Sequence, residues 1–435
     1  MCSFLVLYCP LYGKKLQLVR SSNHPLMFAN SGKRSEVCEI VDEYQLFVQN
    51  IIDDAWTNGF PFWNVSFSRN KLDFRGYSLL PTQHLKIFKT WLSARMQQAA
   101  GKQAVMMLKA AASKRRKQLY KLAELQRLGK FTKWLQSKID RQPLIKPDAS
   151  DINLELDSRF VDFQEQGGFL FIKIKSVGGQ KGRKVILPIK ETQPSKKWSK
   201  KGQRKDAIRL TKDRLWLIHE IPNKPFCGDQ IVGADQGIVT VLTLSNGLTT
   251  RVCPQGHTLS TIQAGMSRKE RGSRAFGRAQ EHRKNYTNWS LNQLRSGFQG
   301  IKEVRLEKIR NLRKDKRTPR FLTHWVYPLV KQKIVRLGEE EGFLFKEVSN
   351  EFRSQRCAKC GWVRRANRKG KTFKCDHCDH VDGADLNAAS NLRLDLYEIP
   401  YWVRLKRINR KGFFWTPDGI FTESWEPIVP STTKT

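Results

Sequence analysis

The chain has 435 residues, with 79 lysines and arginines against 40 aspartates and glutamates, a formal net charge of +39. A protein this basic repels itself unless an anionic partner neutralises it, and nucleic-acid phosphate is the usual partner. The length allows roughly two to four domains, and no apolar run approaches the ~20 residues of a membrane-spanning helix. A ribosomal or chromatin-type protein is an alternative, although such proteins are usually shorter and poorer in aromatic residues.

The cysteines and the first residues indicate the cellular compartment in which the protein works. Four of the nine cysteines have metal-ligand spacing and the others are scattered, which favours a reducing compartment over a disulfide framework. The opening MCSFLVLYCP lacks a basic stretch and a small-residue cleavage site, so it predicts a first strand rather than a signal peptide. We therefore expect a cytoplasmic protein associated with the prokaryotic nucleoid.

The first 150 residues show two patterns. Residues 1–80 mix short apolar runs with turn signals, which predicts short strands and helices. From Thr82, apolar residues recur three and four positions apart with basic residues between them, so the pattern becomes helical. The basic band Ser113–Lys117 is the part of this helical segment that we expect to face phosphate.

From about Asn153 the pattern is that of strands. FLFIKIKSV, RKVILPIK and RLWLIHEI predict β structure with one apolar and one basic face. Between them lies QPSKKWSKKGQRK, which we expect to be a lysine-rich loop. Its Trp198 makes a nucleic-acid surface more plausible than a merely solvated one, because bases stack on aromatic rings.

The following segments carry isolated acids in predicted strands. Asp235 splits the apolar run QIVGADQGIVTVLTL, and Asn246-Gly247 predicts a hairpin. A basic helical region follows, then VRLEKI with Glu307, a helix over about 321–341 and the strand FLFKEVS. Taken alone, Asp235 fits a β-turn as well as a functional carboxylate, and Glu307 fits a surface position better.

The order of the elements favours a functional role for these acids. A hairpin bearing Asp235, a later strand bearing Glu307 and a later helix bearing Asp385 is an RNase H-like arrangement. In that fold three acids converge and hold two hard cations such as Mg²⁺, which require oxygen ligands. One ion activates water and the other stabilises the leaving oxygen of a phosphodiester.

A second metal site is predicted from cysteine spacing. Two C-x2-C pairs are separated by fourteen residues and consist of Cys357, Cys360, Cys375 and Cys378. This spacing indicates a structural Zn²⁺ held by four thiolates, a closed site that is not catalytic. His377 and His380 could compete as ligands, but four cysteines are the simpler set.

These motifs resemble those of TnpB proteins and compact type V CRISPR effectors. GADQG is similar to the first RuvC motif of the family and VRLEKIRNL to the second. SQRCAKCGW, TFKCDHC and ADLNAASNL are similar to its closing segment, and the resemblance covers roughly residues 150–395. Ala234 and Gln236 replace branched apolar residues that are commoner in the family, and His380 follows Asp379 where the family often has glycine.

The resemblance implies an RNA-guided DNA endonuclease. A guide RNA would pair with double-stranded target DNA beside a short flanking motif, and one RuvC site would cut by two-metal chemistry. The catalytic Mg²⁺ ligands would be Asp235, Glu307 and Asp385, and one Zn²⁺ would hold the ribbon ahead of the Asp385 helix. Asn387 and Asn391 could orient the carboxylate or contact nucleic acid. We expect a monomer or small ribonucleoprotein complex with no membrane partner.

The implied fold is α+β and multidomain. An N-terminal β-barrel-like wedge domain with a helical recognition insert precedes an RNase H-like α/β (RuvC) domain with an inserted zinc ribbon. The expected divisions are the wedge over 1–80 and 151–225, the helical insert over 81–150, the RuvC domain over 226–350 with its final helix over 382–400, the ribbon over 351–381 and a tail over 401–435.

Three alternatives stay open. A guide-dependent binder that has lost cleavage would lack one or more of the acids, all of which are present here. A cut-and-paste transposase shares the RNase H-like fold, but its acids normally run Asp, Asp, Glu. A non-enzymatic RNA-binding zinc-ribbon protein would explain the charge and leave the three acids unexplained.

Overall fold

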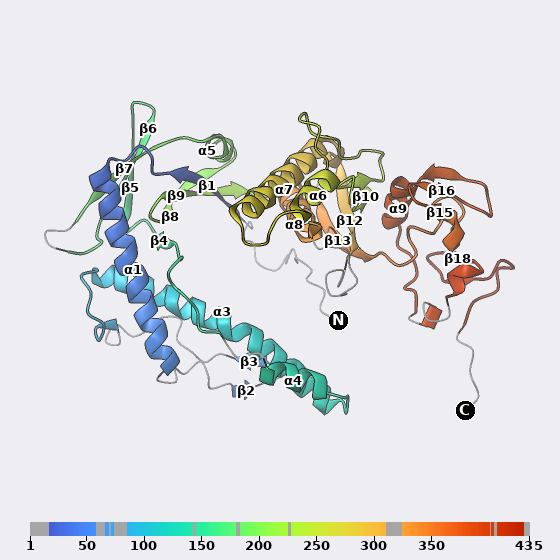
Figure 1. Cartoon of the computed structure of the whole chain (residues 1–435), viewed down its shortest axis with the longest axis horizontal. Helices are drawn as coiled ribbons and strands as arrows, with labels where there is room; N and C mark the ends of the chain where they lie inside the picture. Colours follow the sequence, from blue (N-terminus) through green and yellow to red (C-terminus); the bar gives the residue numbers. More distant parts are fainter. Residues whose placement is uncertain are drawn as a thin grey trace. The chain divides into compact units, whose positions relative to one another are not determined.

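The computed structural model describes residues 17–57, 66–68, 71–73, 85–141, 145–179, 183–224, 228–309, 324–400, 402–403 and 407–429. The chain forms an α+β, multidomain fold with two compact units, Met1–Pro222 and Asn223–Thr435 (Figure 1). The strand predicted over the first ten residues lies outside the described residues. Within them, the helices are all too short or too polar to span a membrane.

The N-terminal unit contains four helices and nine strands in its described part. They are β1 (Gln17–Pro25), α1 (Ser31–Thr57), β2 (Ser66–Ser68), β3 (Lys71–Asp73), α3 (Ala94–Arg127), α4 (Lys133–Arg141), β4 (Leu154–Leu156), β5 (Val161–Gln166), β6 (Phe169–Ile174), β7 (Val185–Lys190), α5 (Gln193–Ser199), β8 (Gln203–Leu210) and β9 (Arg214–Pro222).

The predicted strands of this unit are confirmed as β6, β7 and β9. They belong to two antiparallel sheets, one in the order β1-β9-β8-β4 and one in the order β5-β6-β7. In β6, buried residues alternate with half-buried ones, as a strand with one face on the core requires. The strands that the structure describes form no closed barrel, so the barrel-like form of the wedge is not confirmed.

The prediction of short elements near the N-terminus is wrong for the segment that forms α1, a single helix of 27 residues. Its buried side chains recur three and four positions apart, which is the periodicity of a helix with one face in a core. They include Val37, Tyr44, Val48 and Ile51, each almost fully buried. This helix packs against α3, so the helical part of the unit begins well before residue 81.

The lysine-rich segment predicted as a loop instead contains α5. The Thr192 hydroxyl accepts a hydrogen bond from Ser195 N at the start of α5, with a proline in its first turn. Trp198 is 9% exposed, and the Lys197 Nζ lies 4.1 Å from the centre of its ring. Stacking of a base on Trp198 is therefore excluded in this conformation.

The basic band of α3 is only partly available to phosphate. Arg115 donates a hydrogen bond to the carbonyl of Ile139, so its guanidinium joins α3 to α4. Lys117, two residues further along, is exposed. Arg115 thus has a structural contact within the unit, and the phosphate-facing role of the band stays a prediction.

Two buried histidines connect the sheets of this unit. The Ser22 hydroxyl lies 3.0 Å from Nε2 of His24 and 3.2 Å from Nε2 of His219. The Nδ1–H of His24 donates to the carbonyl of Lys190, 3.0 Å away, and this fixes His24 as the neutral tautomer that accepts at Nε2. His219 then donates to Ser22, and its buried Nδ1 has no partner in the described part of the chain.

The C-terminal unit continues with a mixed sheet, helices and a small ribbon. Its elements are β10 (Gln230–Asp235), β11 (Thr243–Leu244), α6 (Leu259–Ser267), α7 (Arg274–Gln293), η2 (Arg295–Phe298), β12 (Ile301–Lys308), α8 (Tyr327–Glu341), β13 (Leu344–Ser349), β14 (Trp362–Val363), η4 (Arg365–Asn367), β15 (Arg368–Lys369), β16 (Thr372–Lys374), β17 (Val381–Gly383), α9 (Ala384–Leu392), η5 (Ile408–Arg410), β18 (Phe413–Trp415) and β19 (Ile420–Phe421).

The main sheet of this unit has the order β11-β10-β12-β13, with β10, β12 and β13 parallel to one another. Val232, Ala234 and Leu306 are buried in one core with side chains of α6, α7 and α8. Gly233 points the other way, where a Cβ would lie 1.9 Å from the carbonyl oxygen of Ala389 in α9. Helices therefore cover both faces of the sheet, with α9 opposite α7 (Figure 1).

The predicted C-terminal tail is wrong for residues 413–421, which form two strands. β18 pairs with β14 of the ribbon, and β19 pairs with β18. Trp415 N also donates to the carbonyl of Gly361, at 3.0 Å. These strands of the predicted tail extend the ribbon by a small sheet.

We predict that the N-terminal unit loses stability in mild acid. Burial lowers the pKa of both His24 and His219. Unfolding restores a pKa near 6.5, so the unfolded chain binds more protons below that pH and the folded state loses up to about 1.4 kcal/mol per pH unit for each histidine. Denaturant unfolding at pH 7.5 and 5.5 would measure this, with His219→Gln reducing the loss and exposed His257→Gln as the control. Equal acid sensitivity in all three proteins would contradict it.

Candidate active site and metal centre

The sheet register brings two of the predicted acids together. Ala234 of β10 pairs with Leu306 of β12, so the next residues, Asp235 and Glu307, lie on neighbouring parallel strands. Because successive side chains alternate between faces, both acids point to the face covered by α9. Asp385 is the second residue of α9, at the end of the helix where a negative charge is favoured.

Burial dominates the electrostatics of these carboxylates. Burial, reinforced by the charges of Glu307 and Asp385, raises the pKa of Asp235 well above its usual range. Burial also raises the pKa of Glu307 to about 7, although a hydrogen bond from Gln236 N, 3.1 Å from Oε1, and the charge of Arg368 act against it. Carboxylates so enclosed cannot all ionise together unless cations join them.

Two cations of the ribbon already contact the third acid. The Arg368 guanidinium lies 3.4 Å from Oδ1 of Asp385, and the Lys371 ammonium contacts Oδ2. The backbone explains this placement, because Ala384 N donates to the carbonyl of Lys371 and so holds the β15–β16 turn beside the start of α9. The sequence analysis missed both cations, because their place beside Asp385 depends on the pairing of β16 with β17.

The three acids line a single cavity of about 450 Å³. Arg368 and Lys371 lie on its wall, and the apolar part of the lining includes Ile238, Val239 and Trp325. Trp325 is held there by a hydrogen bond from its Nε1 to the carbonyl of Gly237, at 3.1 Å. Carboxylate oxygens are the ligands that hard divalent cations such as Mg²⁺ prefer, and such a cation would relieve the repulsion between these acids.

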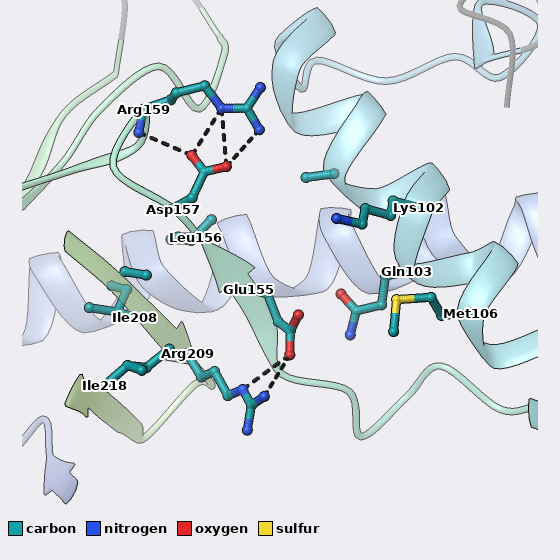
Figure 2. A pocket seen from close by; sticks show the side chains of 12 residues that line it. Lys102, Gln103, Met106, Glu155, Leu156, Asp157, Arg159, Ile208, Arg209 and Ile218 are labelled. Carbon is teal, nitrogen blue, oxygen red and sulfur yellow. Dashed lines mark hydrogen bonds and ion pairs between the residues drawn. The ribbon is translucent and has the colours of Figure 1, made fainter. Parts of the chain in front are cut away.

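A different cavity, in the N-terminal unit, lacks this chemistry (Figure 2). Its acids are already neutralised by arginines: Asp157 binds Arg159, and Glu155 binds Arg209 at 3.0 Å. Its lining otherwise consists of Lys102, Gln103 and apolar side chains from α3, β4, β8 and β9. Separate ion pairs leave no shared set of oxygens for a metal, so we assign no catalytic role to this cavity.

The four cysteines converge as the spacing predicts. Their sulfurs all lie within 4.8 Å of one another. Among the described residues, no other group of three or more histidines, cysteines or acidic residues is placed to hold a metal ion in this way. The Cys357 and Cys378 sulfurs are 3.7 Å apart, and those of Cys360 and Cys375 are 3.6 Å apart. A tetrahedral Zn²⁺ with Zn–S bonds of about 2.3 Å requires a sulfur separation of about 3.8 Å, so the cluster fits that ion.

The two histidines beside the cysteines have other contacts. His377 packs against Phe414, with ring centres 4.9 Å apart, and Nε2 of His380 lies 4.0 Å from Asp382. The Asp379 backbone has a φ of 52°, in the left-handed region that glycine favours and aspartate tolerates. The departure from glycine at this turn therefore leaves the cysteine cluster intact.

The two asparagines of α9 join the helix to the ribbon. Asn387 accepts from Ala358 N at 3.0 Å and donates to the carbonyl of Arg356 at 2.9 Å. Asn391 accepts from the Arg356 guanidinium at 2.6 Å and also donates to the Arg356 carbonyl. Both side chains are fully buried, so the prediction that they orient the carboxylate or contact nucleic acid is wrong for this structure.

Comparison with known proteins identifies this part of the chain. Residues 329–392, which include Asp385 and all four cysteines, match the family described as "Cas12f1-like, TNB domain". A "CRISPR-associated endodeoxyribonuclease Cas12f1" of Sulfoacidibacillus thermotolerans is 35% identical over 97 residues, 22% of each chain. The protein of the same name from Syntrophomonas palmitatica is 30% identical over 78 residues, 18% of this chain and 16% of that one.

The matched part thus spans about a fifth of these curated relatives. A solved structure described as "Cryo-EM structure of the Cas12f1-sgRNA-target DNA complex" aligns with 87% of this chain and 99% of its own, at 15% identity and a TM-score of 0.46. The segment 329–392 defines a domain of compact type V CRISPR effectors. The predicted resemblance to that family is confirmed over this segment, and the particular relatives it matches are the Cas12f1 proteins.

We predict that Gly233→Ala displaces α9. The new Cβ would overlap the Ala389 carbonyl, and overpacking of this kind typically costs about 1–3 kcal/mol. The control is Gly265→Ala in α6, where no atom lies within 4 Å of the new Cβ. Here the higher helix propensity of alanine should raise the free energy of unfolding by about 0.5–1 kcal/mol. Denaturant unfolding would compare the two, and equal stability of both variants would refute the close contact.

We also predict about one Zn²⁺ per chain, measured by metal analysis of the purified protein. Cys375→Ser removes a thiolate ligand and should loosen both the ribbon and α9, seen as faster amide exchange over residues 384–392. Cys38→Ser, outside the ribbon, is the control. Absence of zinc, or full DNA cutting by a Cys357→Ser plus Cys375→Ser protein, would count against the prediction.

Proposed function

We propose that the chain is an RNA-guided DNA endonuclease with one RuvC-like catalytic site. The observation that carries this proposal is the convergence of Asp235, Glu307 and Asp385, which are far apart in sequence, on a single cavity. The order and direction of the strands around them support an RNase H-like domain. The curated relatives that match part of this chain are named endodeoxyribonucleases, which supports a reaction on DNA.

Each kind of residue in the cavity would have its own role in the reaction. Asp235, Glu307 and Asp385 would hold two Mg²⁺ ions. When bound, such ions make water nucleophilic and stabilise the leaving oxygen of a phosphodiester. Arg368 and Lys371 line the same cavity, so they would meet the anionic backbone of a strand that enters it. The apolar wall of Ile238, Val239 and Trp325 would exclude water around the sugar of that strand.

The net charge of +39 supports guide RNA and target DNA as partners. Exposed basic side chains are frequent along α3 and α4 and in the turn between them; they are Arg95, Lys102, Lys117, Lys121, Arg127, Lys130, Lys133, Lys138 and Arg141. In an RNA-guided protein, base pairing reads the sequence and such residues contact backbones, beside a short flanking motif read by the protein. The same partners would place the protein at the nucleoid of a prokaryotic cytoplasm.

We predict that Asp235→Ala abolishes DNA cutting and that Glu307→Gln lowers it by at least a hundredfold. Glu307→Gln keeps the shape of the side chain and removes the negative charge that a hard cation requires. Target binding should persist in both variants, because it depends on many basic residues spread over the protein. The measurement is cleavage of a matched plasmid in Mg²⁺, alongside a gel shift on the same target.

The control is Glu347→Gln, which removes a carboxylate paired with Lys331 outside the cavity. Wild-type cutting by Glu307→Gln would refute its assignment as a ligand. Cutting with unchanged site preference after RNase treatment would refute the guide. If the wild-type protein binds its target and never cuts it, the binder without cleavage replaces the nuclease.

A further inference from the structure

Gln236 is a polar side chain enclosed at the catalytic cavity with part of its hydrogen-bonding capacity unused. It is 6% exposed and lines the cavity between Asp235 and Glu307. Its Nε2 faces the backbone carbonyl of Glu307 at 3.4 Å, a long contact that still fixes which end of the amide is nitrogen. Its Oε1 is buried without a partner among the described residues. An amide oxygen in that state ordinarily costs about 1–3 kcal/mol.

The lining that Gln236 belongs to gives this oxygen a chemical context. The same lining contains the carboxylates of Asp235, Glu307 and Asp385. Amide carbonyls are ordinary ligands of hard cations, alongside carboxylates and water. Gln236 therefore places an unpartnered oxygen of this kind on a residue of the cavity lining.

We propose that the side-chain carbonyl of Gln236 is an additional oxygen ligand of the divalent cation held by Asp235 and Glu307. This inference rests on the proposed function, because it presupposes a cation at these acids. The backbone supports the geometry: Gln236 N donates to Oε1 of Glu307 at 3.1 Å, which ties the residue to one ligand while it follows the other in sequence. As a neutral ligand, the amide adds an oxygen without adding to the repulsion between the carboxylates.

The test is Mn²⁺ binding to the full-length chain without RNA, measured by calorimetric titration and by the shift of Tm with Mn²⁺. Gln236→Met keeps the size of the side chain and removes the carbonyl. We expect its Mn²⁺ affinity to fall by about tenfold or more. Its Tm without Mn²⁺ should be equal to or above that of the wild-type protein, because an unsatisfied buried polar group has been removed.

Gln263→Met is the matched control. Gln263 is fully buried, its Nε2 lies 3.4 Å from the His324 carbonyl, and its Oε1 likewise has no partner in the described part of the chain. It does not belong to the cavity lining, so its replacement should leave Mn²⁺ affinity unchanged. An equal loss of affinity in both variants would show a general effect of core polarity and overturn the proposal.

Asp235→Ala separates this inference from the proposed function. If Asp235→Ala abolishes Mn²⁺ binding and Gln236→Met matches the wild-type affinity, the cation site stands and the role of Gln236 is wrong. If Asp235→Ala binds Mn²⁺ as the wild-type protein does, no cation belongs to these acids and the proposed nuclease chemistry fails with it. If Asp235→Ala and Gln236→Met both lose Mn²⁺ affinity while Gln263→Met keeps the wild-type affinity, the result supports Gln236 as a ligand.

Discussion

The close contact between α9 and β10 is the constraint on which the site depends. Asp235 and Glu307 lie side by side at the ends of β10 and β12 because these strands are parallel and in register. Asp385 reaches them only because Gly233 lets the backbone of α9 lie directly on β10. A side chain at position 233 would push α9 away and separate Asp385 from the other two acids. Because the whole helix would move, no change of the Asp385 rotamer could bring its carboxylate back.

The ribbon that carries the four cysteines holds the other side of the same helix. Asn387 and Asn391 are four residues apart, so they share one face of α9, and both bond to the backbone of Arg356 beside Cys357. Ala389 lies on the sheet face. A metal bound by the cysteines would therefore act on Asp385 mechanically, through hydrogen bonds that hold α9, and without contributing an open coordination position.

Sequence patterns predicted the site better than they predicted the N-terminal unit. Cysteine spacing and acids at strand ends are local signals of chemistry, and the structure brings both sets together. Helix α1 shows the periodicity of a buried helix, but its mixture of charged and apolar residues looked like a series of short elements. Trp198 was misjudged because a charge run was taken as exposed, whereas Lys197 covers the ring and the side chain is buried. Tertiary packing decided these cases.

The roles of individual polar residues were the least predictable part. Position along α9 already argued against Asn387 as a partner of Asp385, since residues two apart on a helix point to nearly opposite sides. Arg368 and Lys371 required the pairing of β16 with β17, which no local pattern reveals. Their contacts with Asp385 show a site balanced between carboxylate repulsion and cationic side chains. A cation that binds Asp385 would compete with these two ion pairs, so metal binding at this acid would be coupled to the position of the ribbon hairpin.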